Sequence, residues 1–230
     1  MSFGQNLQFL RKMRNRMTQE ELAEKMNVSR QTVSKWELDA AYPEISKLAE
    51  LCTLFSCTMD ELVRHDMTLS SDAYSNLRVE WVEALRYIRY AVISQEPESD
   101  AIGHVQAWAQ KLGIADPEII GWDFPKASQE QINVYNMHGY AAALILPDGC
   151  TPVGPGTEIC CQPRQKYLAI TIQEPHTASF TLIPGAYKML DTYMKANGTS
   201  HKQDPAVLDC FEKEYDRDGR HYMDVYIAIQ

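Results

Sequence analysis

Apolar residues in the first 65 positions recur every three or four residues, in short runs that polar caps and turns separate. Leu7, Leu10 and Met13 have this spacing, which predicts a helix over residues 5–15. The same signals predict four more helices. The second follows a Thr18–Glu21 capping box with Leu22, Ala23 and Met26 inward, and the third runs from the Ser29 cap to Glu37. The fourth begins at about Pro43 with Ile45, Leu48, Ala49 and Cys52 inward, and the fifth follows the Thr58 cap with Leu62 inward. Five such helices make a small all-α core.

The pattern changes after residue 65. Residues 66–77 are polar and small without apolar periodicity, which predicts a linker. Beyond the linker, stretches typical of strands alternate with helical stretches. The predicted elements are a strand within 78–93, a helix at 98–112, strands at 140–146 and 167–172, a helix at 184–196, and strands at 210–215 and 222–229.

The order strand, helix and strands occurs twice in this second part. It predicts an α+β domain with a mostly antiparallel sheet and two pseudo-symmetric strand-helix-strand repeats. The predicted organisation is therefore an all-α domain at 1–65, a linker at 66–77 and an α+β domain at 78–230.

Charge divides the chain at the same place. The 230 residues have a formal net charge of −9. Nine Lys/Arg and ten Asp/Glu occur up to Asp66, a net charge of −1, so the remainder has a net charge of −8. An acidic protein can still bind DNA if its cations gather on one face. The asymmetry predicts different tasks for the two parts.

Several function classes are disfavoured by what the sequence contains. It has no apolar run of signal-peptide length and no 18 consecutive apolar residues, which predicts a cytoplasmic protein. The six cysteines form no CxxC or Cys/His ligand ladder, and the later histidines show no ligand spacing. We therefore expect no metal site, no cofactor and no catalytic residue. The histidines expected to be ordinary solvated or hydrogen-bonded side chains are His104, His138, His176, His201 and His221.

The second and third predicted helices are about three residues apart, which is helix-turn-helix spacing. The segment TQEELAEKMNVSRQTVSKWE at 18–37, with LRKMRNRM before it and PEISKLAEL after it, resembles the lambda-repressor-like (XRE-type) DNA-binding domain. The resemblance covers about residues 5–65. It implies that the first turn of the third helix enters the major groove of double-stranded DNA.

Polar residues remain on the outer face of the third helix if Val33 and Trp36 are buried. Arg suits the two acceptors of guanine and Gln suits adenine. The resemblance makes Arg30, Gln31 and Thr32 the base readers, with Lys35 on the same face. It also makes Gln19, at the start of the second helix, a phosphate contact. A solvated surface is the alternative for a polar helix, but the complete motif favours DNA binding.

One loop departs from the family pattern. Leu38-Asp39-Ala40 follows Glu37 where the family usually has Asn-Gly-Lys/Arg. Asp39 can adopt the left-handed conformation that the turn requires. The missing cation at Ala40 predicts weak DNA binding per monomer, and therefore a homodimer on an inverted-repeat operator.

The last 65 residues carry a second resemblance. YLAITIQEP at 167–175, CFEKEY at 210–215 and MDVYIAI at 223–229 resemble the gyrase-inhibitor-like (AraC-type) effector-binding domain. Residues 78–146 fit by pattern only. The resemblance implies a pseudo-twofold repeat around a cleft in which an acidic residue meets flat cationic compounds. The matching acid is Glu212, and the candidate aromatic walls are Trp122, Tyr140, Tyr187 and Tyr226. Burial in the hydrophobic core is the alternative for each aromatic residue.

Together these features predict a transcriptional regulator whose operator affinity depends on a small molecule, for which the resemblance implies a cationic, aromatic compound. Two alternatives stay open. The second domain could hydrolyse its ligand with Glu212 as general base, or it could sequester a toxic small molecule.

Overall fold

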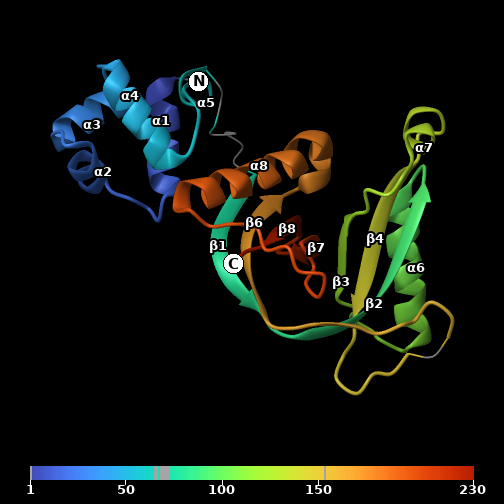
Figure 1. Cartoon of the computed structure of the whole chain (residues 1–230). Coiled ribbons are helices and arrows are strands. Elements are labelled where there is room, and N and C mark those ends of the chain that lie inside the picture. The colour runs from blue at the N-terminus through green and yellow to red at the C-terminus, as the bar shows by residue number, and fades with distance from the viewer. Residues whose placement is uncertain (1, 65–66, 68–72, 153) are drawn as a thin grey trace. The chain divides into compact units, whose positions relative to one another are not determined.

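The computed structural model describes residues 2–64, 67, 73–152 and 154–230. The chain divides into two compact units, one formed by residues 1–72, 180–201 and 230, the other by residues 73–179 and 202–229 (Figure 1). The predicted fold class is confirmed, because five helices are followed by an antiparallel sheet with helices. Half of the predicted linker at 66–77 lies outside the described residues, and the first strand already begins at Tyr74, inside the predicted linker. The boundary at 78 stays a prediction.

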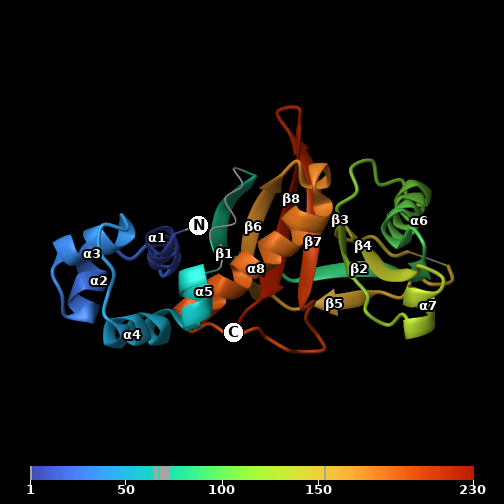
Figure 2. The same ribbon diagram turned by 90° about the horizontal axis from the view of Figure 1, so that it is seen from above.

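The five N-terminal helices match the predicted helices closely. They are α1 (Phe3–Met13), α2 (Gln19–Met26), α3 (Arg30–Glu37), α4 (Ile45–Phe55) and α5 (Met59–Arg64). The Thr18 capping box is present, and the Ser29 hydroxyl accepts a hydrogen bond from the Thr32 amide at the start of α3. Helices α2 and α3 pack side by side (Figure 2).

The inward face of α4 was predicted correctly for Leu48 and Cys52 and wrongly for Ile45 and Ala49. Ile45 and Ala49 are exposed, whereas Leu51 and Phe55 are buried. The inward stripe therefore runs through Leu48, Leu51, Cys52 and Phe55, one helical turn later than predicted. The first turn of α4 extends past the small core, so its apolar Ile45 meets solvent.

The second unit is built on one eight-stranded sheet in the order β1-β6-β8-β7-β3-β4-β2-β5. All pairs of neighbouring strands are antiparallel. Its elements are β1 (Tyr74–Val82), β2 (Leu85–Ser94), α6 (Pro97–Lys111), β3 (Ile119–Asp123), α7 (Gln129–Asn133), β4 (His138–Ile145), β5 (Cys160–Gln162), β6 (Gln165–Gln173), η1 (Pro175–Thr177), β7 (Cys210–Arg217) and β8 (Arg220–Ala228). Between η1 and β7 the chain forms α8 (Ser179–Asn197), which groups with the first unit.

The predicted internal repeat is present in the strand order. Read from its two edges, the sheet runs β5-β2-β4-β3 and β1-β6-β8-β7, so β3 and β7 meet at the centre. One residue pair, Gly121 with Glu212, joins these two central strands. The candidate ligand-binding acid therefore lies where the two repeats meet.

The sheet has a different apolar cluster on each face. Helix α6 covers β2, β4 and β3 on one face, where Val105 packs with Leu144 and Tyr140 (Figure 1). Phe211 and Tyr226 belong to the cluster on the other face. Because side chains alternate along a strand, neighbours such as Phe211 and Glu212 face opposite sides.

A search of the helices in the described part of the chain found none with the length and apolar character needed to cross a bilayer.

Candidate functional site

Helix α3 has a polar outer face and a buried apolar inner face. Val33 and Trp36 are 0% and 4% exposed. Arg30, Gln31 and Lys35 are exposed, and Thr32 is half-buried beside the Ser29 cap. The predicted base-reading residues therefore lie on the exposed side of this helix. Their contact with DNA remains a prediction.

A buried ion pair that the sequence did not predict holds α3 in place. Arg11 and Glu37 are 8% and 6% exposed, and two guanidinium nitrogens contact the two carboxylate oxygens at 2.5 and 3.0 Å. The Arg11 guanidinium also donates to the Met17 carbonyl oxygen, at 2.5 Å. Gln19 donates from Nε2 to Glu37 Oε2 at 2.8 Å. This network connects the start of α2 and the end of α3 to α1.

The loop after α3 keeps the predicted turn. Asp39 has a φ of 53°, so it adopts the left-handed conformation expected of it. Its Oδ1 accepts a hydrogen bond from the Gly4 amide at 2.9 Å. A Cβ atom at Gly4 would lie 2.5 Å from the carbonyl oxygens of Trp36 and Glu37. Only glycine lets the start of α1 approach the end of α3 this closely.

The acid predicted to bind a ligand lines a pocket of about 230 Å³ between α6 and the centre of the sheet. Glu212 and Glu214 from β7 form one side, Tyr140 and Gly121 the floor, and Ile102 and Gln106 from α6 the other side. Glu212 is 9% exposed, and the Tyr140 hydroxyl donates to its Oε2 at 3.4 Å. The structure thus brings together two of the five predicted ligand-binding residues.

Glycine at position 121 makes this meeting possible. A Cβ atom there would lie 2.1 Å from the Tyr140 hydroxyl oxygen. Because Gly121 pairs with Glu212 in the sheet, the tyrosine ring crosses β3 to reach the carboxylate. Any side chain at 121 would push the hydroxyl away from Glu212.

Several carboxylates lie in or near the pocket. Burial raises the pKa of Tyr140 above its ordinary value, and the carboxylates of Glu212, Glu98 and Glu214 raise it further. Tyr140 is therefore a neutral hydrogen-bond donor. Burial also raises the pKa of Glu98, and the charge of Glu214 adds to this rise. Such a concentration of carboxylates favours a cationic occupant.

The other predicted wall residues lie elsewhere. Tyr226 stacks on Phe211 at 4.5 Å between ring centroids, and its hydroxyl accepts a hydrogen bond from Arg78 at 3.0 Å. Trp122 packs against the same cluster, on the sheet face opposite Glu212. Tyr187 is a half-buried residue of α8, in the first unit. Trp122 and Tyr226 therefore lie on the opposite face of the sheet from Glu212, and Tyr187 belongs to the other unit. The ligand contacts of all three stay predictions.

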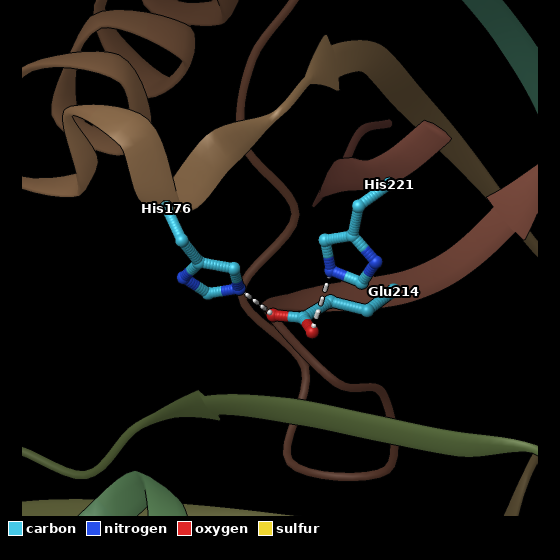
Figure 3. A group of neighbouring side chains, drawn as sticks. All are labelled: His176, Glu214 and His221. Carbon is cyan, nitrogen blue, oxygen red and sulfur yellow. Dashed lines mark hydrogen bonds and ion pairs between the residues drawn. The ribbon is translucent and has the colours of Figure 1, made fainter. Parts of the chain in front are cut away.

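Two histidines expected to be scattered in fact lie together. His176 from η1 and His221 from β8 both contact the carboxylate of Glu214, at 3.0 and 3.1 Å (Figure 3). Sequence spacing could not show this group, because 38 positions separate His176 from Glu214. The closeness of His221 to Glu214 follows from the pairing of β7 with β8, which sets His221 opposite Asp216, two residues after Glu214.

Comparison with known proteins identifies the N-terminal part. Residues 7–62 match the family described as "Helix-turn-helix". Over 63 residues, 27% of this chain, the sequence is 46% identical to the HTH-type transcriptional activator BcrR of Enterococcus faecalis. The match spans 30% of that relative's length.

Solved structures resemble larger parts of the chain at low identity. The EcmrR C-terminal domain is 11% identical, with a TM-score of 0.48, over 67% of this chain and 97% of that chain. SAV2435 bound to tetraphenylphosphonium is 14% identical, with a TM-score of 0.42, over 68% of this chain and 94% of that chain. By sequence and by geometry, residues 7–62 form a helix-turn-helix domain.

Proposed function

We propose that this protein is a transcriptional regulator that binds DNA through α3 and a small organic cation through the pocket at Glu212. The observation that carries the DNA-binding half is the match of residues 7–62 to the helix-turn-helix family, together with the exposed polar face of α3. The observation that carries the ligand-binding half is the carboxylate-rich pocket at the centre of the sheet.

Each residue of the DNA-binding surface has a separate role in this proposal. Arg30 and Gln31 reach base edges in the major groove, because their side chains are long and exposed at the start of α3. Lys35, one turn later, contacts phosphate. Gln19 lies at the start of α2, where amide groups and the helix dipole favour a phosphate, and its bond to Glu37 fixes its side chain.

The proposed DNA-binding species is a homodimer. One domain of this size touches few phosphates, and the loop after α3 has Ala40 where a cation is usual, so a single copy would bind weakly. Two copies on an inverted repeat would place the half-site centres about one helical turn, roughly 34 Å, apart.

The DNA-binding half is tested by selecting operator sequences from random DNA with the wild-type protein and then measuring two variants on the selected site. Arg30→Ala should cost about 1–3 kcal/mol of specific binding and relax the preference at one base pair. Gln19→Ala should lower the affinity for specific and for random DNA by the same factor, because a phosphate contact carries no sequence information. Gln8→Ala, on the exposed surface of α1, is the control and should bind as wild type.

If the selection yields no preferred sequence, or if Arg30→Ala weakens specific and random DNA in parallel, α3 does not read bases. Footprints that protect a single half-site in a monomeric complex would contradict the dimer alone.

The ligand proposal rests on the chemistry around Glu212. Glu212 is 9% exposed and its carboxylate accepts a hydrogen bond from Tyr140, while Ile102 and Ile119 supply apolar surface to the same pocket. A flat organic cation can bury its rings against the apolar side and place its charge beside the carboxylates. A charge-assisted contact of this kind contributes about 1.5–3 kcal/mol.

Matched cationic and neutral dyes of one shape test this assignment by calorimetric titration. Glu212→Gln keeps the shape of the side chain and removes its charge, so cationic dyes should lose about ten- to a hundredfold in affinity. Neutral dyes should bind nearly as they do to wild type. Equal losses for both dyes would show that Glu212 supports the structure of the pocket instead. Product analysis of the same samples examines the hydrolase alternative, which requires turnover that Glu212→Gln abolishes.

A further inference from the structure

We propose that His176, Glu214 and His221 form a binding site for a divalent transition-metal ion of the zinc class. The three side chains come from η1, β7 and β8 and converge on one point at the surface of the second unit (Figure 3). Each offers one ligand atom, and these atoms all lie within 4.8 Å of one another.

The distances suit a shared metal ion. Zinc binds histidine nitrogen and carboxylate oxygen at about 2.0–2.1 Å in tetrahedral geometry, so neighbouring ligand atoms are roughly 3.3 Å apart. The Nε2 atoms of His176 and His221 lie 3.0 and 3.1 Å from the two oxygens of Glu214. An ion placed between the three groups would replace these two hydrogen bonds with metal–ligand bonds, and the side chains would rotate to bring all three ligand atoms to the ion.

The backbone holds the two histidines in place. The Glu174 amide donates to the His221 carbonyl oxygen at 2.8 Å, and the His221 amide donates to Glu174 Oε1 at 3.2 Å. These two bonds attach the start of η1 to β8 at the residue that carries the second imidazole. Pro175 then restricts the turn that presents His176. The two imidazole rings stack with centroids 5.5 Å apart.

A second carboxylate orients one of the ligands. His221 contacts Asp216 Oδ1 through Nδ1 at 2.9 Å and points Nε2 at Glu214. Histidine ligands of metals commonly bond a carboxylate through the other ring nitrogen, which fixes the tautomer and the ring orientation. Asp216 is therefore a positioning residue in the proposed site.

The donor set selects the metal class. Two imidazoles and one carboxylate suit zinc, nickel, cobalt or copper and disfavour magnesium and calcium, which prefer oxygen ligands. The His176, Glu214 and His221 side chains are 49%, 32% and 30% exposed, so an ion can enter from solvent. Three protein ligands leave a fourth tetrahedral position for water or an exogenous group.

The test uses Zn²⁺ alone with the full-length chain, in competition with a chromophoric chelator. The exposed Cys161 is replaced in every sample by Ser, so that its thiol does not compete for metal. We expect one Zn²⁺ per chain. His176→Ala and His221→Ala should each lower the affinity at least a hundredfold, and Asp216→Asn about tenfold, within the 10–100-fold range typical of an outer-shell partner.

Two controls separate this site from adventitious binding. His138→Ala removes an exposed histidine at the start of β4 and should leave zinc affinity unchanged. Co²⁺ substitution should give the intense visible absorption of a four-coordinate ion, and His176→Gln, which keeps a side chain of similar length, should abolish it. Circular dichroism of each variant verifies that the chain remains folded.

The proposal is overturned if the Cys161→Ser parent protein takes up less than one Zn²⁺ per chain at micromolar metal. It is equally overturned if His176→Gln binds as tightly as wild type, or if His138→Ala loses as much affinity as His176→Ala. This test requires no dye and no DNA, so its result is independent of the proposed regulatory function.

Discussion

The pair formed by Arg11 and Glu37 shows that the proposed DNA-binding surface is supported by buried residues outside that surface. Both side chains are buried, and Gln19 bonds to the same carboxylate. A hydrophobic pattern cannot reveal this pair, because charged residues at 11 and 37 fit a solvated helix surface equally well. The partner of each is distant in sequence and becomes visible only when α1 and α3 pack.

Arg11→Met should lower the free energy of unfolding of the helix-turn-helix domain by about 3–5 kcal/mol, since it leaves the Glu37 carboxylate buried without its charged partner. The double variant Arg11→Met/Glu37→Leu should recover most of that loss, because apolar residues of similar volume can replace a buried ion pair. Hydrogen exchange of the α1 and α3 amides in the full chain measures the free energy of unfolding of both variants. A double variant no more stable than Arg11→Met would contradict this expectation and show that apolar residues cannot replace the pair.

At the scale of elements, the sequence predicted those helices and strands whose residues carry local signals such as caps and apolar periodicity. The capping residues Thr18, Ser29 and Thr58 each mark a helix start that the structure confirms. Strands β3 and β5 were not predicted, because three to five residues are too few for alternation to show. Strand β1 was missed as a separate strand, because it begins inside the polar stretch that predicted a linker. The pocket was predicted only as far as Glu212 and Tyr140, since the approach of β3 to β7 depends on sheet order, which no local pattern carries.

The close approach of α1 to the end of α3 gives a test at this scale. Gly4→Ala would place a Cβ atom 2.5 Å from backbone oxygens, which neither helix can relieve by rotating a side chain. We expect α1 to shift and the domain to lose about 1–3 kcal/mol of stability. Hydrogen exchange of the α1 amides measures the loss.

Gly103→Ala is the matched control. Gly103 lies inside α6, and a Cβ atom there meets nothing within 4 Å, so alanine should stabilise α6 by up to about 1 kcal/mol. If Gly4→Ala also proved neutral or stabilising, the contact between α1 and the end of α3 would not be as tight as the structure indicates.

At the scale of the whole molecule, Glu214 belongs to two sites at once. It lines the pocket with Glu212 and also contacts both histidines of the proposed metal site. If both proposals hold, bound Zn²⁺ neutralises a carboxylate that attracts the organic cation. Two ligands that share a favourable group must oppose each other, and the coupling between them is reciprocal.

We therefore expect Zn²⁺ to lower the affinity for cationic dyes by about fivefold or more, and the same dyes to lower the affinity for Zn²⁺ by the same factor. Dye titrations at increasing Zn²⁺ measure this coupling. His176→Ala should remove the effect of zinc and leave dye affinity in the metal-free protein nearly unchanged. Dye affinity that does not respond to Zn²⁺ in a protein shown to bind both would mean that the two sites are independent.

The alternation along β7 also determines which genetic changes this unit can tolerate. Glu212, Glu214 and Asp216 share one face because they are two residues apart, and Phe211 and Tyr215 occupy the other. A missense mutation at one of these codons alters a single carboxylate and leaves its neighbours in place. Loss of one codon at the start of the strand would turn every later side chain over, bringing aromatic rings to the pocket and carboxylates into the apolar cluster. The carboxylates of the pocket can therefore change one at a time by replacement of amino acids, whereas a one-residue deletion in β7 would destroy the pocket.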